Sequence, residues 1–150
     1  LIDLVRNDLG RFCQAGSIQV TEKMVLESYE HLHHIVSNIQ GTVRSNQTVR
    51  DIVHAVFPGG TITGCPKVRC MEIISEFEKA PREAYTGSLG YIVLDGQMDL
   101  NILIRTLLYN QNQGSFRAGG GIVYDSIPEK ELMETRHKAR GLLNAIEVND

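Results

Sequence analysis

The order of strand-like and helix-like segments most restricts what this chain can fold into. Residues 18–43 alternate apolar and polar side chains and are rich in β-branched types, which predicts two or three strands with breaks at Gly16-Ser17 and Glu27-Ser28. Apolar residues at helical spacing precede this region, over residues 1–12. Groups of strands with helices between and after them favour an α+β fold, with antiparallel sheets packed by helices, over a repeated βαβ unit.

Three further segments are typical of helices. Residues 48–57 form a short amphipathic pattern with Thr48 as a candidate N-cap. Pro66 suits the first turn of a helix over residues 66–79, because its missing N–H would have no helical partner there. Residues 128–148 predict a long closing helix.

The region between these last two helices predicts an antiparallel meander. Its three apolar segments are residues 87–96, 99–110 and 115–124. Turn-forming residues separate them near Asp95-Gly96 and at residues 112–114. We therefore expect one continuous set of paired strands here.

Composition excludes several classes of protein. The 150 residues are enough for one ordinary domain, with no run of about twenty apolar residues and nothing like a cleavable signal peptide. A net charge of −3 gives no general electrostatic reason to bind nucleic acid. The cysteines are odd in number and contain no CxxC pair, which favours reduced thiols in a cytoplasmic protein: Cys13, Cys65 and Cys70. We expect neither a membrane nor a nucleic acid partner.

The chain opens inside a periodic apolar segment. LIDLVRNDLGRF has no methionine and no capping residue before it. We therefore expect residues 1–150 to be part of a longer polypeptide.

The segment GGTITGCPK, residues 59–67, is typical of a loop that binds an anion. Its glycines permit tight turns, and the helix that begins near Pro66 directs free N–H groups and a positive dipole end at the loop. Lys67 adds a formal charge. A P-loop would need GxxxxGK[ST], and the spacing from Gly60 and Gly64 to Lys67 differs, which argues against nucleoside triphosphate. The alternative is a tight turn before a helix.

Two other groups of residues could serve a ligand. Gly119, Gly120 and Gly121 stand in a predicted strand, where glycine is favoured if a ligand or another backbone approaches closely, although a bulge would explain one of them. Glu131 and Glu134 share a helix face, and this pair of carboxylates suits a hard cation such as Mg²⁺. Lys138 lies on the same face. The alternative for that face is a set of solvated, weak ion pairs.

Histidine and arginine residues supply the remaining candidates. His31 and His33 share a strand face, but no third nitrogen or sulfur ligand has a suitable spacing for zinc. His34 points the other way and could hydrogen-bond a ligand or remain a satisfied core histidine. Arg105 and Tyr91 lie in apolar predicted strands, where a buried guanidinium needs an anion such as a ligand carboxylate.

Together these segments resemble the C-terminal third of the chorismate-utilising enzymes. That family includes anthranilate synthase component I, aminodeoxychorismate synthase component I, isochorismate synthases and salicylate synthases. Seven motifs occur in the family's order: DLVRNDLGR, HHIVSNIQG, GGTITGCPKVRCMEII, GSLGYI, MDLNILIRT, AGGGIVYDS and ETRHKA. GGTITGCPKVR most resembles the aminodeoxychorismate synthase form, since anthranilate synthases more often carry alanine where Gly59 stands.

The resemblance implies a role for each candidate residue. Glu134 would ligate Mg²⁺, with Glu131 beside it, and the ion would hold the ring carboxylate of chorismate. Lys138, a candidate catalytic residue, and the three glycine amides would neutralise and position that end of the substrate. Arg105 and Tyr91 would grip the pyruvyl carboxylate. His34 would act near the ring as a catalytic residue, and the pocket would be lined by Thr61, Thr63 and Gly64.

The resemblance also implies the reaction and its partners. Chorismate would be aminated to 4-amino-4-deoxychorismate with ammonia from a glutamine amidotransferase subunit. The alternatives are anthranilate synthesis, with loss of pyruvate, and a non-catalytic domain that keeps the fold. The family's upstream PIKGT lysine and a further Mg²⁺ glutamate are absent from these 150 residues. We therefore expect this fragment to be inactive without the N-terminal part and to expose apolar surface and sheet edges.

Overall fold

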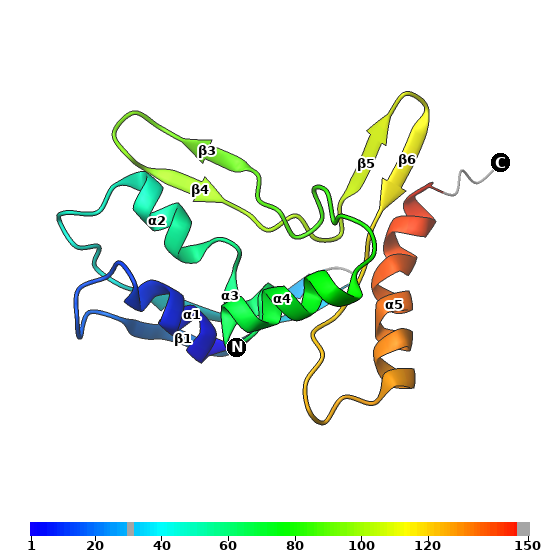
Figure 1. Ribbon diagram of the computed structural model, residues 1–150, viewed down its shortest axis with the longest axis horizontal. Helices are drawn as coiled ribbons and strands as arrows, with labels where there is room; N and C mark the ends of the chain where they lie inside the picture. Colours follow the sequence, from blue (N-terminus) through cyan, green and yellow to red (C-terminus); the bar gives the residue numbers. More distant parts are fainter. Residues whose placement is uncertain (30–31, 147–150) are drawn as a thin grey trace. The chain divides into compact units, whose positions relative to one another are not determined.

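The computed structural model describes residues 1–29 and 32–146, without the side chains of Tyr29, Leu32 and His34. Figure 1 shows the elements in chain order. They are α1 (Ile2–Gly10), β1 (Gln19–Tyr29), β2 (Leu32–Gln40), α2 (Val49–Val56), α3 (Gly60–Thr63), α4 (Lys67–Phe77), β3 (Gly90–Ile92), β4 (Met98–Leu100), β5 (Leu107–Asn110), β6 (Gln113–Phe116) and α5 (Pro128–Ile146). The chain divides into two compact units, Leu1–Phe77 and Glu78–Asp150. The predicted α+β class is confirmed.

The core of the first unit lies directly after helix α1. Phe12 and Cys13 are buried there, and Cys13 forms an isolated bridge with Val43. A Cβ on Gly41 would lie 2.8 Å from Cys13 Sγ, so a glycine is needed for the two segments to approach this closely.

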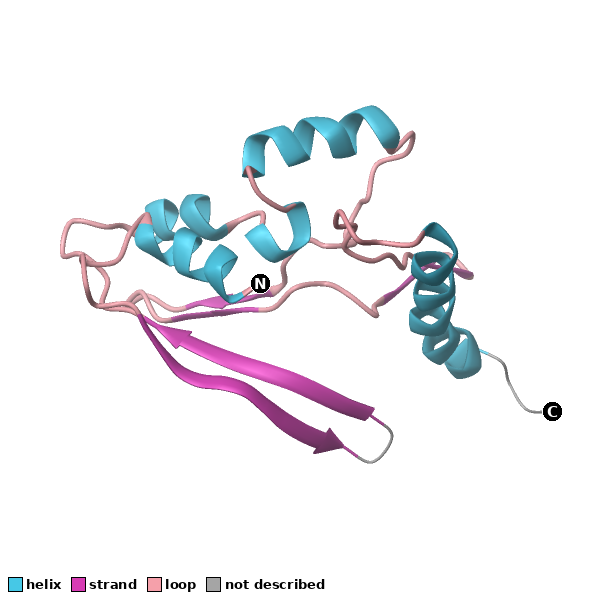
Figure 2. Ribbon diagram, turned by 90° about the horizontal axis from the view of Figure 1, so that it is seen from below, coloured by secondary structure: helices cyan, strands magenta, loops and turns pink. Residues whose placement is uncertain are grey.

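Strands β1 and β2 form a long antiparallel hairpin, which Figure 2 shows as the longest pair of strands. The predicted break at Glu27-Ser28 is wrong, because both residues continue β1 and pair with β2. The hairpin is a two-stranded sheet with exposed apolar side chains such as Leu26 and Ile35. The expected exposure of apolar surface is therefore confirmed for this unit.

Helices α2 and α4 begin as the sequence predicts. Thr48 Oγ1 accepts the backbone N–H of Asp51 at 3.2 Å, and the Asp51 carboxylate accepts the Thr48 N–H at 2.9 Å, which completes a capping box. A hydrogen bond from the Thr48 hydroxyl to the Asp51 carboxylate, at 2.7 Å, and the one from the Thr48 N–H lower the pKa of Asp51. Helix α4 starts at Lys67, directly after Pro66, and ends at Phe77. No helix of the described residues is long and apolar enough to cross a membrane.

The second unit contains two separate hairpins instead of the predicted meander. Strands β3 and β4 pair around a turn at Gly96, and β5 and β6 pair around a turn whose central residues, Gln111 and Asn112, both have positive φ. The segment 101–106 lies outside the strands. Hydrogen bonds in both directions join it to residues 86–89 without the regular pattern of a sheet, and Arg105 adopts φ +51°. Gly119, Gly120 and Gly121 also lie outside any strand, which corrects their predicted setting.

Candidate functional site

Helix α5 brings two carboxylates and an ammonium group to the triple-glycine segment. Lys138 Nζ lies 2.6 Å from Glu134 Oε1 and donates to the carbonyl of Gly119 at 3.3 Å. A Cβ on Gly120 would lie 3.6 Å from Glu131 Oε2, 3.7 Å from Lys138 Nζ and 3.9 Å from Glu134 Oε1. The three side chains therefore converge on one short stretch of backbone, which we call the α5 cluster.

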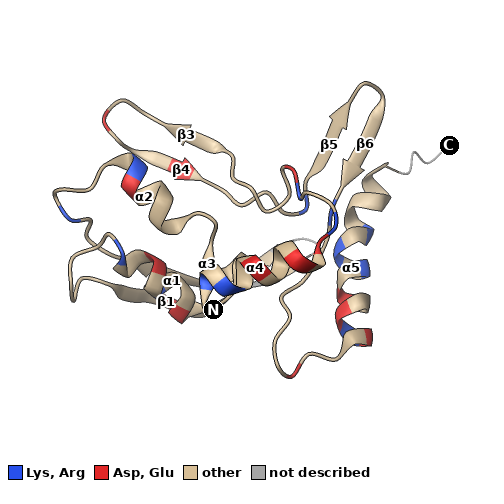
Figure 3. Ribbon diagram, viewed as in Figure 1, with Lys and Arg blue, Asp and Glu red and all other residues tan. Residues whose placement is uncertain are grey.

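The α5 cluster is open to solvent. Acidic and basic residues both lie along α5 (Figure 3), and the Glu134 side chain is exposed. The hydrogen bond from Lys138 lowers the pKa of Glu134, so this carboxylate stays ionised at neutral pH. Glu131 accepts a hydrogen bond from Ser126 Oγ at 2.7 Å, which fixes its direction. The cluster presents charges of both signs to an incoming ligand.

The donor set of the α5 cluster is compatible with Mg²⁺. Within residues 1–29 and 32–146, no three His, Cys, Asp or Glu side chains are grouped closely enough to hold a metal by themselves. Mg²⁺ in proteins commonly takes one or two carboxylates and fills its other positions with waters and ligand oxygens. Glu131 and Glu134 would supply the two carboxylates.

A tyrosine that the sequence analysis missed lies against the same glycines. A Cβ on Gly119 would be 3.0 Å from Tyr85 Oη, so the phenol oxygen lies close to that backbone. Tyr91, the residue we selected from the sequence, lies in β3 opposite Asp99 and is exposed. In the sequence, the one feature that could have identified Tyr85 is the spacing Arg-x-x-Tyr, which forms a turn. In that turn the Tyr85 N–H donates to the Arg82 carbonyl at 3.1 Å.

Arg82 holds Tyr85 in place. Its guanidinium donates twice to Glu78, at 2.8 and 2.6 Å, and once to Thr86 Oγ1 at 3.2 Å. The guanidinium carbon lies 6.0 Å from the centroid of the Tyr85 ring, within reach of a cation–π contact. The hydrogen bond from Arg82 lowers the pKa of Glu78. The turn is therefore fixed by one arginine.

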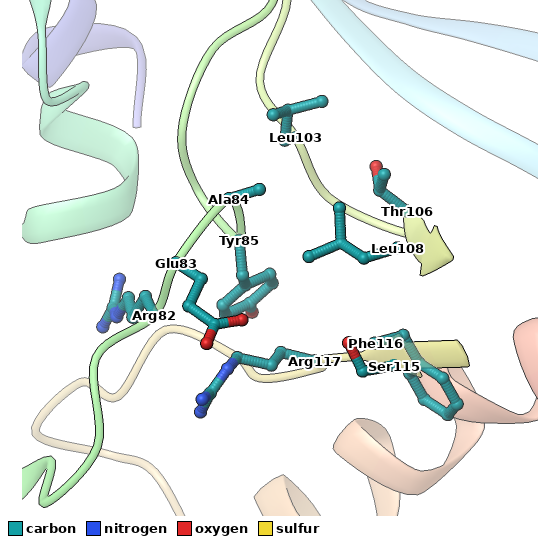
Figure 4. A pocket seen from close by; sticks show the side chains of 10 residues that line it. All are labelled: Arg82, Glu83, Ala84, Tyr85, Leu103, Thr106, Leu108, Ser115, Phe116 and Arg117. Carbon is teal, nitrogen blue, oxygen red and sulfur yellow. The ribbon is translucent and has the colours of Figure 1, made fainter. Parts of the chain in front are cut away.

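A cavity of about 340 Å³ adjoins this turn. It is lined by Arg82, Glu83, Ala84, Tyr85, Leu103, Thr106, Leu108, Ser115, Phe116 and Arg117. Figure 4 shows Tyr85 and Arg117 reaching the space from different segments of the chain. Tyr85 thus connects the cavity with the triple-glycine segment.

Arg105 differs from its predicted setting. We expected a guanidinium buried in a strand, but Arg105 is exposed, lies between β4 and β5, and has φ +51°. A bulky residue in the left-handed region is strained, and such residues are common at functional sites. Its predicted contact with a ligand carboxylate stays a prediction.

The GGTITGCPK loop of the first unit does bind an anion, and that anion belongs to the chain itself. Asp8 on α1 is buried, with 6% of its surface exposed. Its Oδ2 accepts the backbone N–H of Gly60 at 2.9 Å, and its Oδ1 lies 2.8 Å from Lys67 Nζ. Lys67 therefore stabilises the loop through Asp8. The predicted ligand contacts of this segment then fall to the residues between Gly60 and Lys67.

Those residues differ in what their hydroxyl groups do. Thr63 Oγ1 donates to the Gly59 carbonyl at 3.1 Å, whereas Thr61 is exposed and its hydroxyl has no hydrogen bond to a described residue. Gly64 has φ +100°, which favours glycine. Thr61 is thus the better placed of the two threonines to contact a ligand.

The histidine predictions fall at the edge of what the structure describes. The imidazole of His33 is 3.0 Å from Ser28 Oγ across the hairpin, through Nδ1. His31 lies outside the described residues, and so does the side chain of His34, whose backbone belongs to β2. The catalytic role of His34 stays a prediction.

Comparison with known sequences places these features in a family. The model of the chorismate binding enzyme family matches residues 1–144. The chain is 52% identical to an anthranilate synthase component I-like protein of Synechocystis sp., over 98% of this chain and 30% of that protein. It is 47% identical to aminodeoxychorismate synthase component 1 of Bacillus subtilis, over 100% of this chain and 32% of that protein.

Solved structures agree with the sequence comparison. Anthranilate synthase component I from Streptococcus pneumoniae superposes with a TM-score of 0.85 at 41% identity, over 95% of this chain and 33% of that one. A putative 2,3-dihydroxybenzoate-specific isochorismate synthase from Bacillus anthracis gives a TM-score of 0.84 at 29% identity, over 99% of this chain and 39% of that one. The chain spans about a third of the length of the curated relatives it matches. It belongs to the chorismate binding enzyme family.

Proposed function

We propose that residues 1–150 form the C-terminal portion of the chorismate-binding catalytic domain of a Mg²⁺-dependent enzyme that makes 4-amino-4-deoxychorismate. Ammonia would come from a glutamine amidotransferase subunit, and the product would serve 4-aminobenzoate and folate synthesis. The observation that carries the proposal is the convergence of Glu131, Glu134 and Lys138 on Gly120. Family membership supports chorismate as the substrate. That the product is 4-amino-4-deoxychorismate is proposed in addition.

The α5 cluster suits the ring carboxylate of chorismate. Gly120 has no side chain, so an anion can approach its backbone beside the Lys138 ammonium, which would lie 3.7 Å from a Cβ there. Glu131 and Glu134 would hold the Mg²⁺ ion, which when bound supplies positive charge to stabilise the carboxylate as the ring hydroxyl departs. Lys138 would orient the same group by a charge-assisted hydrogen bond.

The pyruvyl carboxylate would be bound near the other side of the triple-glycine segment. Tyr85 offers a phenol hydroxyl against Gly119, and this geometry favours Tyr85 over Tyr91 for the role. Arg105 offers a fork of donors that matches a carboxylate. The fixed turn around Arg82 would keep the Tyr85 hydroxyl in one direction before the substrate arrives.

Anthranilate synthase component I is the second candidate function. It is favoured by relatives of that name, such as the one from Methanothermobacter marburgensis, 46% identical over 99% of this chain and 32% of that protein. The relative named for the aminodeoxychorismate reaction is 47% identical, so identity does not separate the two products. The glycine at position 59 favours 4-amino-4-deoxychorismate, because the GGTITGCPKVR segment resembles the aminodeoxychorismate synthase form. A non-catalytic domain that retains the fold is the third possibility.

The test is turnover of chorismate by the complete gene product with ammonium and Mg²⁺. We expect chorismate to be consumed and Glu134→Gln to lower kcat by about 100-fold or more, as for loss of a group that stabilises transition-state charge. Glu129→Gln is the matched control, since Glu129 lies in the first turn of the same helix and is exposed. Absence of chorismate consumption would refute the enzyme proposal.

The product distinguishes the two enzyme candidates. Anthranilate is fluorescent and appears directly, whereas 4-amino-4-deoxychorismate gives 4-aminobenzoate only after a lyase is added. Anthranilate fluorescence without added lyase would favour anthranilate synthase over the aminodeoxychorismate synthase proposal.

A further inference from the structure

One serine hydroxyl joins the segment after the three glycines to helix α5. Ser126 Oγ accepts the backbone N–H of Val123 at 3.0 Å and lies 2.7 Å from Glu131 Oε1. Because the N–H can only donate, the Ser126 hydroxyl accepts there and gives its own proton to the Glu131 carboxylate. The hydroxyl is therefore used in both directions, and all three residues belong to the unit Glu78–Asp150.

The backbone fixes both partners of this contact. The Ser126 N–H donates to the Val123 carbonyl at 3.0 Å, which closes a tight turn, and the Glu131 N–H donates to the Ile127 carbonyl at 3.0 Å at the start of α5. Ser126 and Glu131 are half-buried, whereas Glu134 is exposed. Water therefore competes less for the contact between Ser126 and Glu131 than for an exposed one.

The two carboxylates of the α5 cluster differ in which oxygen is free. Glu134 Oε1, which would lie 3.9 Å from a Cβ on Gly120, is also 2.6 Å from Lys138 Nζ. Glu131 Oε2 would lie 3.6 Å from the same Cβ and has no hydrogen bond to a described residue. Since Ser126 occupies Oε1 of Glu131, the second oxygen remains available beside Gly120.

We propose that Ser126 is a positioning residue of the metal site, which holds Glu131 in the orientation that leaves Oε2 free for Mg²⁺. This inference rests on the proposed function and deepens it. Ser126 acts through Glu131 and does not itself touch the ion. Groups that hydrogen-bond a ligating side chain fix its orientation, and their loss commonly weakens metal affinity by about 10- to 100-fold. Without the hydroxyl, the flexible Glu131 side chain would have to be ordered when the ion binds.

The test compares Mg²⁺ binding by Ser126→Ala and wild type. The complete gene product is titrated with Mg²⁺ alone, without chorismate, in a calorimeter. We expect Ser126→Ala to raise the Kd for Mg²⁺ by about 10-fold or more, because the Glu131 carboxylate loses its donor. Ser126→Thr keeps a hydroxyl at the same position and is expected to restore most of the affinity.

Ser17→Ala is the matched control, because the Ser17 hydroxyl is also used in both directions. It donates to the Gln14 carbonyl at 2.8 Å and accepts the Thr42 N–H at 3.1 Å, so both of its partners are backbone groups. We expect both alanine variants to lower the unfolding midpoint in denaturant and only Ser126→Ala to weaken Mg²⁺ binding. A serine with a merely structural role would change the midpoint alone.

Should Ser126→Ala fail to fold, Ser126→Cys keeps a group of similar shape with a much weaker donor. This variant is expected to fold and to show the same loss of Mg²⁺ affinity. Wild-type affinity in a folded Ser126 variant without the hydroxyl would overturn the inference, and so would an equal loss of affinity in Ser17→Ala. A wild-type protein that binds no Mg²⁺ would instead refute the metal site of the proposed function, and that result is seen before any variant is compared.

Discussion

Two carboxylate–ammonium pairs of similar length have different surroundings in the two units. The Lys67–Asp8 pair is 2.8 Å long with side chains 12% and 9% exposed, and the Lys138–Glu134 pair is 2.6 Å long with side chains 35% and 57% exposed. The first pair is out of water, so each charge depends on its partners within the protein, which for Asp8 include the Arg11 guanidinium with Nε 3.9 Å from Oδ1, whereas water screens the second pair. Exposure, not distance, therefore separates a pair that holds the chain together from one that is available to a ligand.

A third pair lies between these extremes. The Arg82–Glu78 contact is 2.6 Å long with side chains 25% and 41% exposed, and it is made through two hydrogen bonds. If exposure determines how much an ion pair stabilises the fold, the Lys67–Asp8 pair should contribute most, the Arg82–Glu78 pair less and the Lys138–Glu134 pair least.

The largest effect is expected for the buried pair. Lys67→Met leaves the buried Asp8 carboxylate with only the Gly60 N–H and the Arg11 guanidinium, 3.9 Å away, which we expect to lower the free energy of unfolding by about 3 kcal/mol. Lys138→Met, in the exposed pair, is expected to cost less than about 1 kcal/mol. Denaturant unfolding of the complete gene product, monitored by hydrogen exchange in residues 58–67, measures the stability loss of both variants. Equal losses would remove the distinction between the two pairs.

An intermediate effect is expected for Arg82→Met. This change removes two charge-assisted hydrogen bonds from a partly exposed site, at a cost of about 1–2 kcal/mol. It also frees Tyr85, so we expect KM for chorismate to rise. Arg69→Met on α4 is the control, because Arg69 forms exposed pairs with Glu72 and Glu76 at 2.9 and 3.4 Å. Similar effects of the two changes on KM would contradict a role for Arg82 in orienting Tyr85.

A smaller effect is expected from pH. The hydrogen bond from Arg82 lowers the pKa of Glu78 below its ordinary value of 4.5, so the folded state holds this proton less tightly than the unfolded state. The stability it contributes is present above pH 4.5 and is lost as the pH falls through the lowered value. Unfolding midpoints measured in that acid range should converge for wild type and Arg82→Met. An unchanged gap between them would contradict the linkage.

Local patterns in the sequence were sufficient to predict the parts of the fold made by neighbouring residues. The shared face of Glu131, Glu134 and Lys138 follows from helical spacing, and the cap at Thr48 follows from its own side chain. Contacts between residues far apart in sequence left no such pattern. The Asp8–Lys67 pair joins a helix to a distant loop, and nothing local identifies it.

The failure to predict the two hairpins of the second unit has a physical cause as well. Residues 99–110 have the composition of one strand, but the Asn101 side chain accepts the Leu89 N–H at 3.0 Å and the backbone then turns at Arg105. The role of Tyr91 stays a prediction. Tyr85 has no comparable strand motif, and only the structure brings its hydroxyl close to Gly119.

The smallest effect on stability is expected at Gly120, where the exposed cluster can be tested as a ligand site. A Cβ there would make ordinary contacts at 3.6–3.9 Å, so Gly120→Ala should change the free energy of unfolding by less than about 0.5 kcal/mol. The methyl group would still occupy the space between Glu131, Glu134 and Lys138, which we expect to raise KM for chorismate several-fold.

Gly141→Ala provides the control for this last change, because a Cβ on Gly141 meets nothing within 4 Å and the residue lies in α5. It is expected to stabilise the helix by about 0.5–1 kcal/mol and to leave KM unchanged. Steady-state kinetics and unfolding of the same preparations separate the two quantities. If Gly120→Ala binds chorismate as wild type does, the ligand does not lie beside Gly120 at the α5 cluster, and the Lys138–Glu134 pair would be no more than a solvated contact on a helix.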